Sequence, residues 1–365
     1  MNFKHFSFLA VLLCSLMTTK AQVGGKYVYP FLSTPYSARL AALGGALVSV
    51  RDEDPTLIMY NPSSISPTFH TSLSVNCIDY FNSAVYASAL YSHTFEKVGS
   101  FAFEFKTLNY GKFQYTNEFG EELGAFYAGD YAATVGWGRQ LDSNWSIGAN
   151  LKLILSDYED YNSFGVAVDV AGSYYNPEKR LSLSLLVKNL GSQIKPFTPG
   201  NYERLPFDIQ FALSQRLQHL PLRYHISFHS LYKWKMGYVG ENDPMLEYDV
   251  ITGEPQYPSR FSQEMNNFFR HIVFGIEIIP IKQLSLFVSY NHHRNREMYI
   301  LQKKTLAGFS YGFMLNFNNI QFAFARAHYA AGATPNYFSF SLNINDLSKL
   351  SKEKKTRKLS RKTDN

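Results

Sequence analysis

The sequence predicts a transmembrane β-barrel of fourteen antiparallel strands whose lumen holds an N-terminal plug. Three observations support this fold class. Apolar and polar side chains alternate over long stretches of residues 69–347. Aromatic residues make up 16% of the chain, as expected for the lipid-facing band and the interfacial girdles of such barrels. Short and long connections also alternate along the chain, which is the loop asymmetry of outer-membrane barrels.

Residues 1–21 are typical of a secretory signal peptide. A basic start is followed by an apolar run at residues 6–17, which is too short to cross a bilayer as a helix, and Ala21 offers a small residue for cleavage. A lipoprotein signal is the alternative, because Cys14 is available, but Cys14 lies inside the apolar run. The mature chain would keep one cysteine, Cys77, and could form no internal disulfide.

Residues 22–68 do not alternate and are predicted to form the plug, or hatch. Ser37 is suited to cap a short apolar helix over residues 37–50. A Gly-Gly pair inside that helix would allow close packing in a crowded lumen. Residues 51–54 are then expected to form a solvated turn.

The alternating segments give the strand count. Between residues 306 and 318, one face carries Phe309, Tyr311 and Phe313, and the other carries mostly small or polar residues. A period of two over this length indicates a strand whose apolar face contacts lipid and whose polar face lines the lumen. The predicted strands lie at residues 69–81, 84–95, 98–109, 128–141, 144–157, 162–175, 180–193, 205–218, 220–234, 268–281, 283–295, 304–318, 319–330 and 335–346.

The connections agree with this count. Those after even-numbered strands are tight, whereas the longest ones, at 110–127, 194–204 and 235–267, all follow odd-numbered strands. Tight turns are periplasmic in outer-membrane barrels, and an even strand number places both chain ends on the periplasmic side. The strands are longer than the ~10 residues needed to cross a bilayer, so the wall should project beyond it.

The last segment, residues 348–365, is a basic tail. It holds eight Lys and Arg against Glu353 and Asp364, which matches the formal net charge of +6 of the whole chain. The basic character therefore belongs to the tail and does not indicate a nucleic-acid-binding surface. Because the tail is polar and has no aromatic residue, it is predicted to be a solvated, disordered periplasmic extension. The alternative is an electrostatic contact with anionic headgroups or an acidic partner.

Sequence motifs for catalysis are weak. Residues 308–312 match the Gly-x-Ser-x-Gly pattern of serine hydrolases, but they lie within an alternating segment, where the required strand-to-helix turn does not form. His292 and His293 are adjacent, and adjacent strand residues point to opposite faces, so the pair is not expected to bind a metal unless the strand has ended. The chain is therefore predicted not to be an enzyme and to have no catalytic, cofactor or metal site.

The predicted hatch carries a motif. It consists of an Ala-Leu-Gly-Gly-Ala run, an acidic pair and an Asn-Pro step: Leu43, Gly44, Gly45, Asp52, Asp54, Asn61 and Pro62. This motif resembles the N-terminal hatch of FadL-type long-chain fatty-acid transporters, which have fourteen-stranded barrels. Within that superfamily the chain looks closest to the PorQ and PorV barrels of the Bacteroidetes type IX secretion system. The resemblance covers the chain from its predicted mature start to Leu347, and its motif part about 25 residues of it.

The resemblance implies a non-enzymatic component of the outer membrane of a Gram-negative bacterium. PorQ-like barrels hold a large surface protein, PorZ, in the complex that cleaves secreted cargo and attaches it to lipopolysaccharide. The cleavage there belongs to a separate sortase, PorU, which PorV anchors. Expected partners are thus a PorZ-like surface protein, the PorU and PorV attachment complex, and outer-membrane lipids with lipopolysaccharide.

Two functions remain open from the sequence. In the first, the barrel is a platform, and the long loop 235–267 binds a protein partner or, alternatively, only covers the barrel mouth. The candidate contact residues are Tyr238, Met245, Leu246, Tyr248, Ile251, Tyr257 and Phe261. In the second, the barrel transports a hydrophobic small molecule, which requires an apolar inner pocket. The mostly polar inward residues disfavour such a pocket, but hatch residues such as Leu40 and Val50 could line one.

Overall fold

The computed structural model describes residues 27–52, 54–80, 84–237, 247–248, 252, 255–298, 305–317, 320–330 and 332–344. The predicted signal peptide at 1–21 and the predicted tail at 348–365 lie outside the described residues, as do Tyr238, Met245, Leu246 and Ile251.

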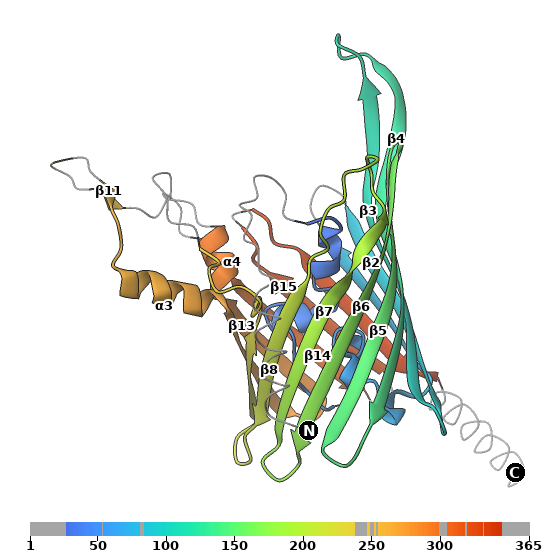
Figure 1. Ribbon diagram of the computed structural model, residues 1–365. Helices are drawn as coiled ribbons and strands as arrows, with labels where there is room; N and C mark the ends of the chain where they lie inside the picture. The colour runs from blue at the N-terminus through green and yellow to red at the C-terminus, as the bar shows by residue number, and fades with distance from the viewer. Residues whose placement is uncertain are drawn as a thin grey trace, which may run out of the picture.

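The described chain folds into a closed antiparallel barrel (Figure 1). Each strand pairs with its sequence neighbour in the wall, and the first strand pairs with the last, Ser72 opposite Asn343, to close it. Fourteen strands form the wall, as predicted: β1 Ser72–Asp79, β2 Val85–Phe95, β3 Gly99–Thr116, β4 Glu122–Gln140, β5 Trp145–Tyr158, β6 Tyr161–Asn176, β7 Leu181–Lys195, β8 Asp208–Arg216, β9 Leu222–Phe228, β12 Ile272–Ile281, β13 Leu284–Asn291, β14 Phe309–Phe317, β15 Ile320–Ala327 and β16 Asn336–Asn343. A separate pair, β10 (Glu247–Tyr248) and β11 (Pro255–Gln256), lies outside the barrel wall.

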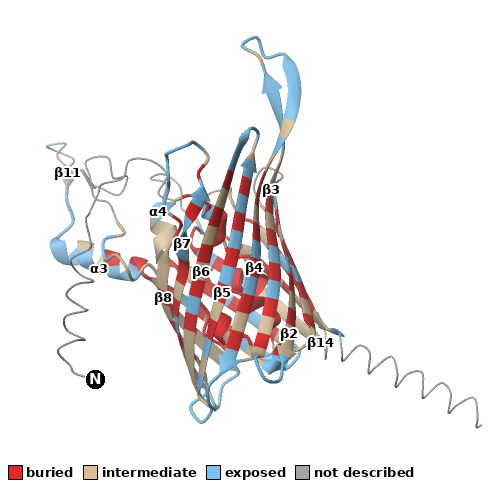
Figure 2. Ribbon diagram, turned by 45° about the vertical axis from the view of Figure 1, so that its right-hand side comes forward, coloured by how far each residue is buried: buried red, intermediate tan, exposed pale blue. Residues whose placement is uncertain are grey.

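Burial alternates along the strands, as Figure 2 shows by its colour bands. On β3, Phe103 and Phe105 are about half exposed, whereas Glu104 and Lys106 between them are buried. This is the inverse of a soluble sheet, in which the apolar face is the buried one, and it fits a wall with lipid outside and packed protein inside. Cys77 lies on the outward face of β1 and is exposed.

The connections differ in several places from the sequence prediction. Residues 110–127 are not a loop, because β3 and β4 continue through most of them as a two-stranded ribbon that projects beyond the other strands (Figure 1). The second difference is at residue 268, where a strand was predicted to start. The chain there is still in helix α3 (Arg260–Arg270), and β12 begins only at Ile272.

The strand predicted over 283–295 also ends early. β13 stops at Asn291, whose side chain caps helix α4 (His292–Glu297) by accepting a hydrogen bond from the backbone N–H of Arg294. The tight connections after β2, β4, β6, β8 and β12 all lie at one end of the barrel. The start of β1 and the end of β16 lie at that same end. We refer to it as the tight-turn end and to the opposite one as the long-loop end.

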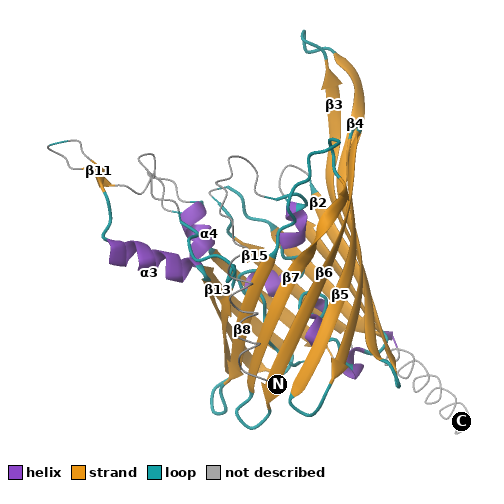
Figure 3. Cartoon of the chain, in the orientation of Figure 1, coloured by secondary structure: helices purple, strands orange, loops and turns teal. Residues whose placement is uncertain are grey.

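The hatch lies inside the barrel as short helical turns (Figure 3). They are η1 (Pro30–Ser33), α2 (Ala38–Ala42), η2 (Pro55–Leu57), η3 (Pro62–Ser64) and η4 (Pro67–Phe69). Ser37 caps α2 as predicted, its side chain accepting from the Leu40 N–H at 3.1 Å. The helix ends at Ala42, well before the predicted Val50, because Gly44 and Gly45 adopt positive φ angles of 92° and 82°. None of the helices in the described ranges is long and apolar enough to span a membrane.

Candidate functional site: the hatch and its contacts in the lumen

An ion-pair cluster joins the hatch to the barrel wall. Arg39 of α2 is 1% exposed and contacts three carboxylates: Asp52 at 2.6 Å, Asp54 at 3.2 Å and Glu277 of β12 at 3.1 Å. Arg223 of β9 completes the cluster, with its Nη1 at 2.8 Å from Asp52 and 3.0 Å from Glu277. The two arginines thus bridge acidic groups from the hatch and from the wall.

The pKa values of the hatch groups follow from these contacts. Burial favours the neutral form of Asp52, but the Arg39 and Arg223 guanidinium groups outweigh it and lower the pKa of Asp52 to about 2. Asp54 is buried more deeply and contacts Arg39 alone, so burial prevails and raises the pKa of Asp54. Burial acts against the charge of Arg39, yet its three carboxylate neighbours raise the pKa of Arg39. Arg39 is therefore a permanent cation in a buried position.

The predicted solvated turn at residues 51–54 is wrong. Asp54 is 4% exposed and binds both Arg39 and the Thr56 side chain. Short acidic segments between apolar ones are usually solvated. This segment is buried because Arg39 and the wall residues Arg223 and Glu277 form ion pairs around it. Arg39 was visible in the sequence just before the motif, but nothing local indicated its wall partners.

A second set of polar contacts lies deeper in the lumen, where lysines of the wall meet tyrosine rings of the hatch. Lys106 of β3 lies 3.8 Å from the ring centroid of Tyr36, and Lys188 of β7 lies 4.1 Å from that of Tyr60. Cation–π contacts of this kind strengthen when both groups are desolvated. The wall also pairs its own buried charges, for example Lys152 with Asp169 at 2.6 Å.

The hatch motif residues are spread over these contacts. Leu43 is buried in the core between hatch and wall. A side chain at Gly44 would place its Cβ 2.2 Å from Val273 of β12, so the backbone approaches the wall as the glycine pair predicted. Asn61 donates from its side chain to Ser184 of β7 at 3.2 Å. A Cβ added to Gly148 of β5 would lie only 2.1 Å from the carbonyl oxygen of Pro62. Hatch and wall therefore interlock through backbone as well as charge.

Two cavities flank the hatch. One of about 540 Å³ opens at the tight-turn end and is lined by the ion-pair cluster together with Arg180, Arg216 and Lys282. The other, of about 440 Å³, lies at the long-loop end against Gly44, Gly45 and Tyr60. Among the described residues none lines both, so the hatch separates two vestibules.

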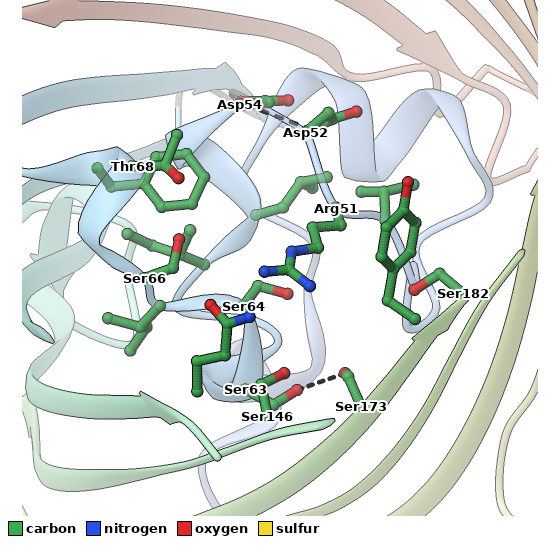
Figure 4. Close-up of a pocket in the computed structure, with 17 residues that line it drawn as sticks. Arg51, Asp52, Asp54, Ser63, Ser64, Ser66, Thr68, Ser146, Ser173 and Ser182 are labelled. Atoms are coloured by element: carbon green, nitrogen blue, oxygen red, sulfur yellow. Dashed lines mark hydrogen bonds between the residues drawn. The ribbon is translucent and has the colours of Figure 1, made fainter. Parts of the chain in front are cut away.

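A third and much smaller cavity lies between the hatch and the wall (Figure 4). Its volume is about 60 Å³, and Leu57, Ile65 and Phe69 line it together with serines and Arg51. Ligand pockets for drug-sized molecules measure about 300–1,000 Å³. The hatch as it stands leaves no such space here for a hydrophobic molecule of that size.

The remaining candidate residues lie elsewhere. Tyr257 and Phe261 are exposed near the start of α3, and Tyr248 belongs to β10, so the structure does not bring them to the hatch. Ser310 of the Gly-x-Ser-x-Gly match is 1% exposed within β14, without a strand-to-helix turn. The strand has ended before His292 and His293, which lie in α4. Within the described ranges, no group of three His, Cys, Asp or Glu residues could hold a metal ion.

Comparison with protein-family models and with curated proteins finds no match. Solved structures do match. The alignment with a TodX deltaS2S3 mutant monoaromatic hydrocarbon channel covers 85% of this chain and 99% of the channel's chain, with a TM-score of 0.51 and 12% sequence identity. The fold is that of TodX-like outer-membrane β-barrels. A TodX deltaS2 mutant channel covers the same shares with a TM-score of 0.50 and 12% identity.

A further match is the toluene transporter TodX of Pseudomonas putida, with a TM-score of 0.49, 10% identity and coverage of 84% of this chain and 96% of that one. At such identities the likeness concerns the fold alone.

Proposed function

We propose that the chain is a non-enzymatic outer-membrane platform that holds a surface protein while the hatch keeps the lumen closed. The observation that carries this proposal is the ribbon formed by residues 110–127. It stands beyond the other strands at the long-loop end (Figure 1). A barrel that only crossed the bilayer would need strands of about 10 residues, whereas β3 and β4 have 18 and 19.

The ribbon has free edges and exposed aromatic groups. β2 pairs with β3 only as far as Asn109, and β5 pairs with β4 only from Ala128, so beyond these points the two strands pair only with each other. Phe119 at the tip is 88% exposed and Tyr127 is 67% exposed. An isolated two-stranded ribbon is marginally stable in water, and free strand edges favour pairing with another chain. A partner strand would supply what the ribbon lacks.

The charge of the ribbon defines the partner further. Residues 110–127 contain three acidic residues, Glu118, Glu121 and Glu122, and one basic residue, Lys112. The neighbouring turn between β5 and β6 adds Glu159 and Asp160, both exposed. The complementary partner therefore carries basic residues beside an apolar strand or groove. Within the resemblance of the hatch motif to PorQ and PorV barrels, the partner would be a PorZ-like protein of the type IX secretion system.

The test replaces residues 112–127 by a two-residue Asn-Gly turn, which closes a hairpin on the paired residues Gly111 and Ala128. Affinity purification from detergent-solubilised outer membranes of the source bacterium should then lose the large surface proteins that co-purify with the intact chain, while the barrel still assembles. The matched control shortens the connection 196–204, which also lies at the long-loop end. Retention of every partner by the ribbon variant contradicts the platform proposal at this surface.

A second candidate is passage of a small hydrophobic molecule, which is favoured by the fold shared with a TodX hydrocarbon channel. The small cavity beside Leu57 and Phe69 would have to grow through movement of the hatch. Uptake of radiolabelled toluene by cells that express the chain tests this candidate. Uptake above that of cells with an unrelated closed barrel supports transport, and equal uptake argues against it for this class of compound.

A further inference from the structure

Helix α3 has one apolar and one polar face. Apolar side chains recur at residues 261, 265, 268 and 269, which is the spacing of a single helical face. Phe261 is 77% exposed and Phe269 is 47% exposed. Large aromatic groups on an unpartnered helix face are unusual in a region that contacts water, unless another surface covers them.

The polar face of α3 is already occupied by the protein. The Asn266 side-chain oxygen lies 3.0 Å from His292 Nε2 of α4. Asn267 is buried and accepts a hydrogen bond from the backbone N–H of Gly237 at 3.1 Å. The apolar face is therefore the more open one, although the Phe269 ring centroid lies 6.1 Å from that of His292 in α4. Figures 1 and 2 both show α3 protruding sideways from the wall near the long-loop end, across the strand direction.

The chain next to α3 adds to this surface. Trp234 is 52% exposed, lies 6.5 Å from the Phe268 ring and donates from Nε1 to Glu264 at 2.6 Å. We define the α3 patch as the five exposed apolar residues Leu231, Trp234, Phe261, Phe268 and Phe269. Two exposed cations, Lys235 and Arg260, flank it.

The α3 patch is continuous with the lipid-facing band of the wall. After His271 the chain enters β12, where Phe274 and Ile278 point outward and are 43% and 41% exposed. Aromatic side chains, tryptophan above all, concentrate where barrels meet the membrane interface. An amphipathic helix with cations beside its apolar face binds in the plane of an anionic lipid surface.

We propose that α3 is an interfacial helix whose patch inserts into the outer leaflet of the membrane, with Lys235 and Arg260 against anionic headgroups. This docking does not depend on the proposed platform function. It would fix the base of the loop 235–267 on the membrane surface. It also assigns Phe261, one of the partner contacts predicted from the sequence, to lipid instead of protein.

Spin labelling tests the proposal in the folded barrel. Single cysteines replace Phe261 or Phe269 on the patch, and Gln263 on the same helix serves as the control because it is partly exposed and lies on the opposite side of the helix from the apolar residues. A Cys77→Ala background leaves one label per mature chain. Each labelled barrel is reconstituted in vesicles of phosphatidylcholine and phosphatidylglycerol, and heat-modifiable gel mobility verifies folding. The measurement is the collision rate of the nitroxide with oxygen, which concentrates in lipid, and with a water-soluble nickel chelate.

The expected result is a reversal between neighbouring positions. Labels at 261 and 269 collide more with oxygen than with the chelate, and the label at 263 does the opposite. High chelate collision at all three positions would show that α3 stands in water and would overturn the proposal. Labels at 261 and 269 that are shielded from both reagents would overturn it too, because they would show a protein contact.

Discussion

Replacing Arg39 by methionine should loosen the hatch without preventing barrel assembly. Methionine keeps a long unbranched side chain and removes the charge. Asp52 and Glu277 would then keep Arg223, at 2.8 Å and 3.0 Å, whereas the buried carboxylate of Asp54 would lose its ion pair with Arg39. Breaking a buried ion pair by removing one partner costs about 3–5 kcal/mol. If hatch docking carries this cost, the population of displaced hatches rises by roughly 10²–10³-fold, since about 1.4 kcal/mol is a factor of ten.

The assay is the conductance of the purified barrel in planar bilayers, together with the rate of proteolysis within the hatch. Arg180→Met is the matched control, because Arg180 lines the same vestibule but is exposed. The double variant Arg39→Met with Glu277→Gln also removes the buried wall carboxylate, so it should recover part of the loss. Conductance and proteolysis equal to those of the unmodified chain in Arg39→Met, or simple addition of the two single effects, would refute this account of the cluster.

Three further predictions follow from the same contacts. Gly44→Ala should destabilise hatch packing by about 1–3 kcal/mol because of the 2.2 Å approach to Val273 and the positive φ. Gly45→Ala should cost less, because the nearest neighbours of its Cβ would lie at 3.2 Å. Thermal unfolding of the two variants compares these costs, and equal destabilisation would contradict the close approach at Gly44. Because the folded pKa of Asp52 is lowered to about 2, its contribution to hatch stability is present above its ordinary pKa of 3.8 and is lost as the pH falls toward 2. Proteolysis of the hatch by pepsin should show this loss. Asp52→Asn should reduce the pH dependence, and an unchanged dependence would contradict the role of Asp52. A cysteine that replaces Asn176 at the tight-turn end and one that replaces Phe119 on the ribbon should react with a membrane-impermeant thiol reagent from opposite sides of the membrane. Reaction of both from the same side would refute the topology.

The strands were predictable because a membrane wall imposes a strict two-residue period on the sequence. The same rule explains the error at 110–127, where three glycines and several charged residues looked like a loop although the strands continue beyond the lipid. The start of β12 was placed too early because Phe268 and Phe269 merge with the apolar run of that strand. The helical spacing from residue 261 onward was present in the sequence and identifies α3 once it is compared with the strand period.

The hatch contacts could not be predicted in the same way. The motif residues Gly44, Asp52 and Asn61 each contact a wall residue that is far away in sequence. Arg39 and Glu277 are 238 positions apart. No periodicity or local propensity connects such residues, because their meeting depends on the closed barrel.

This dependence fixes an order of assembly. Arg39 needs Arg223 and Glu277 side by side, and these come from β9 and β12, which are 54 positions apart and adjacent only in the wall. The tyrosines of the hatch need Lys106 and Lys188 from two other strands, β3 and β7. Without a closed wall, Arg39 would also remain hydrated, so it would form no buried ion pair that stabilises the docked hatch. The hatch can therefore bind fully only after the barrel has closed. A variant with an intact barrel and a loose hatch can exist, but a variant with a docked hatch and an open barrel cannot.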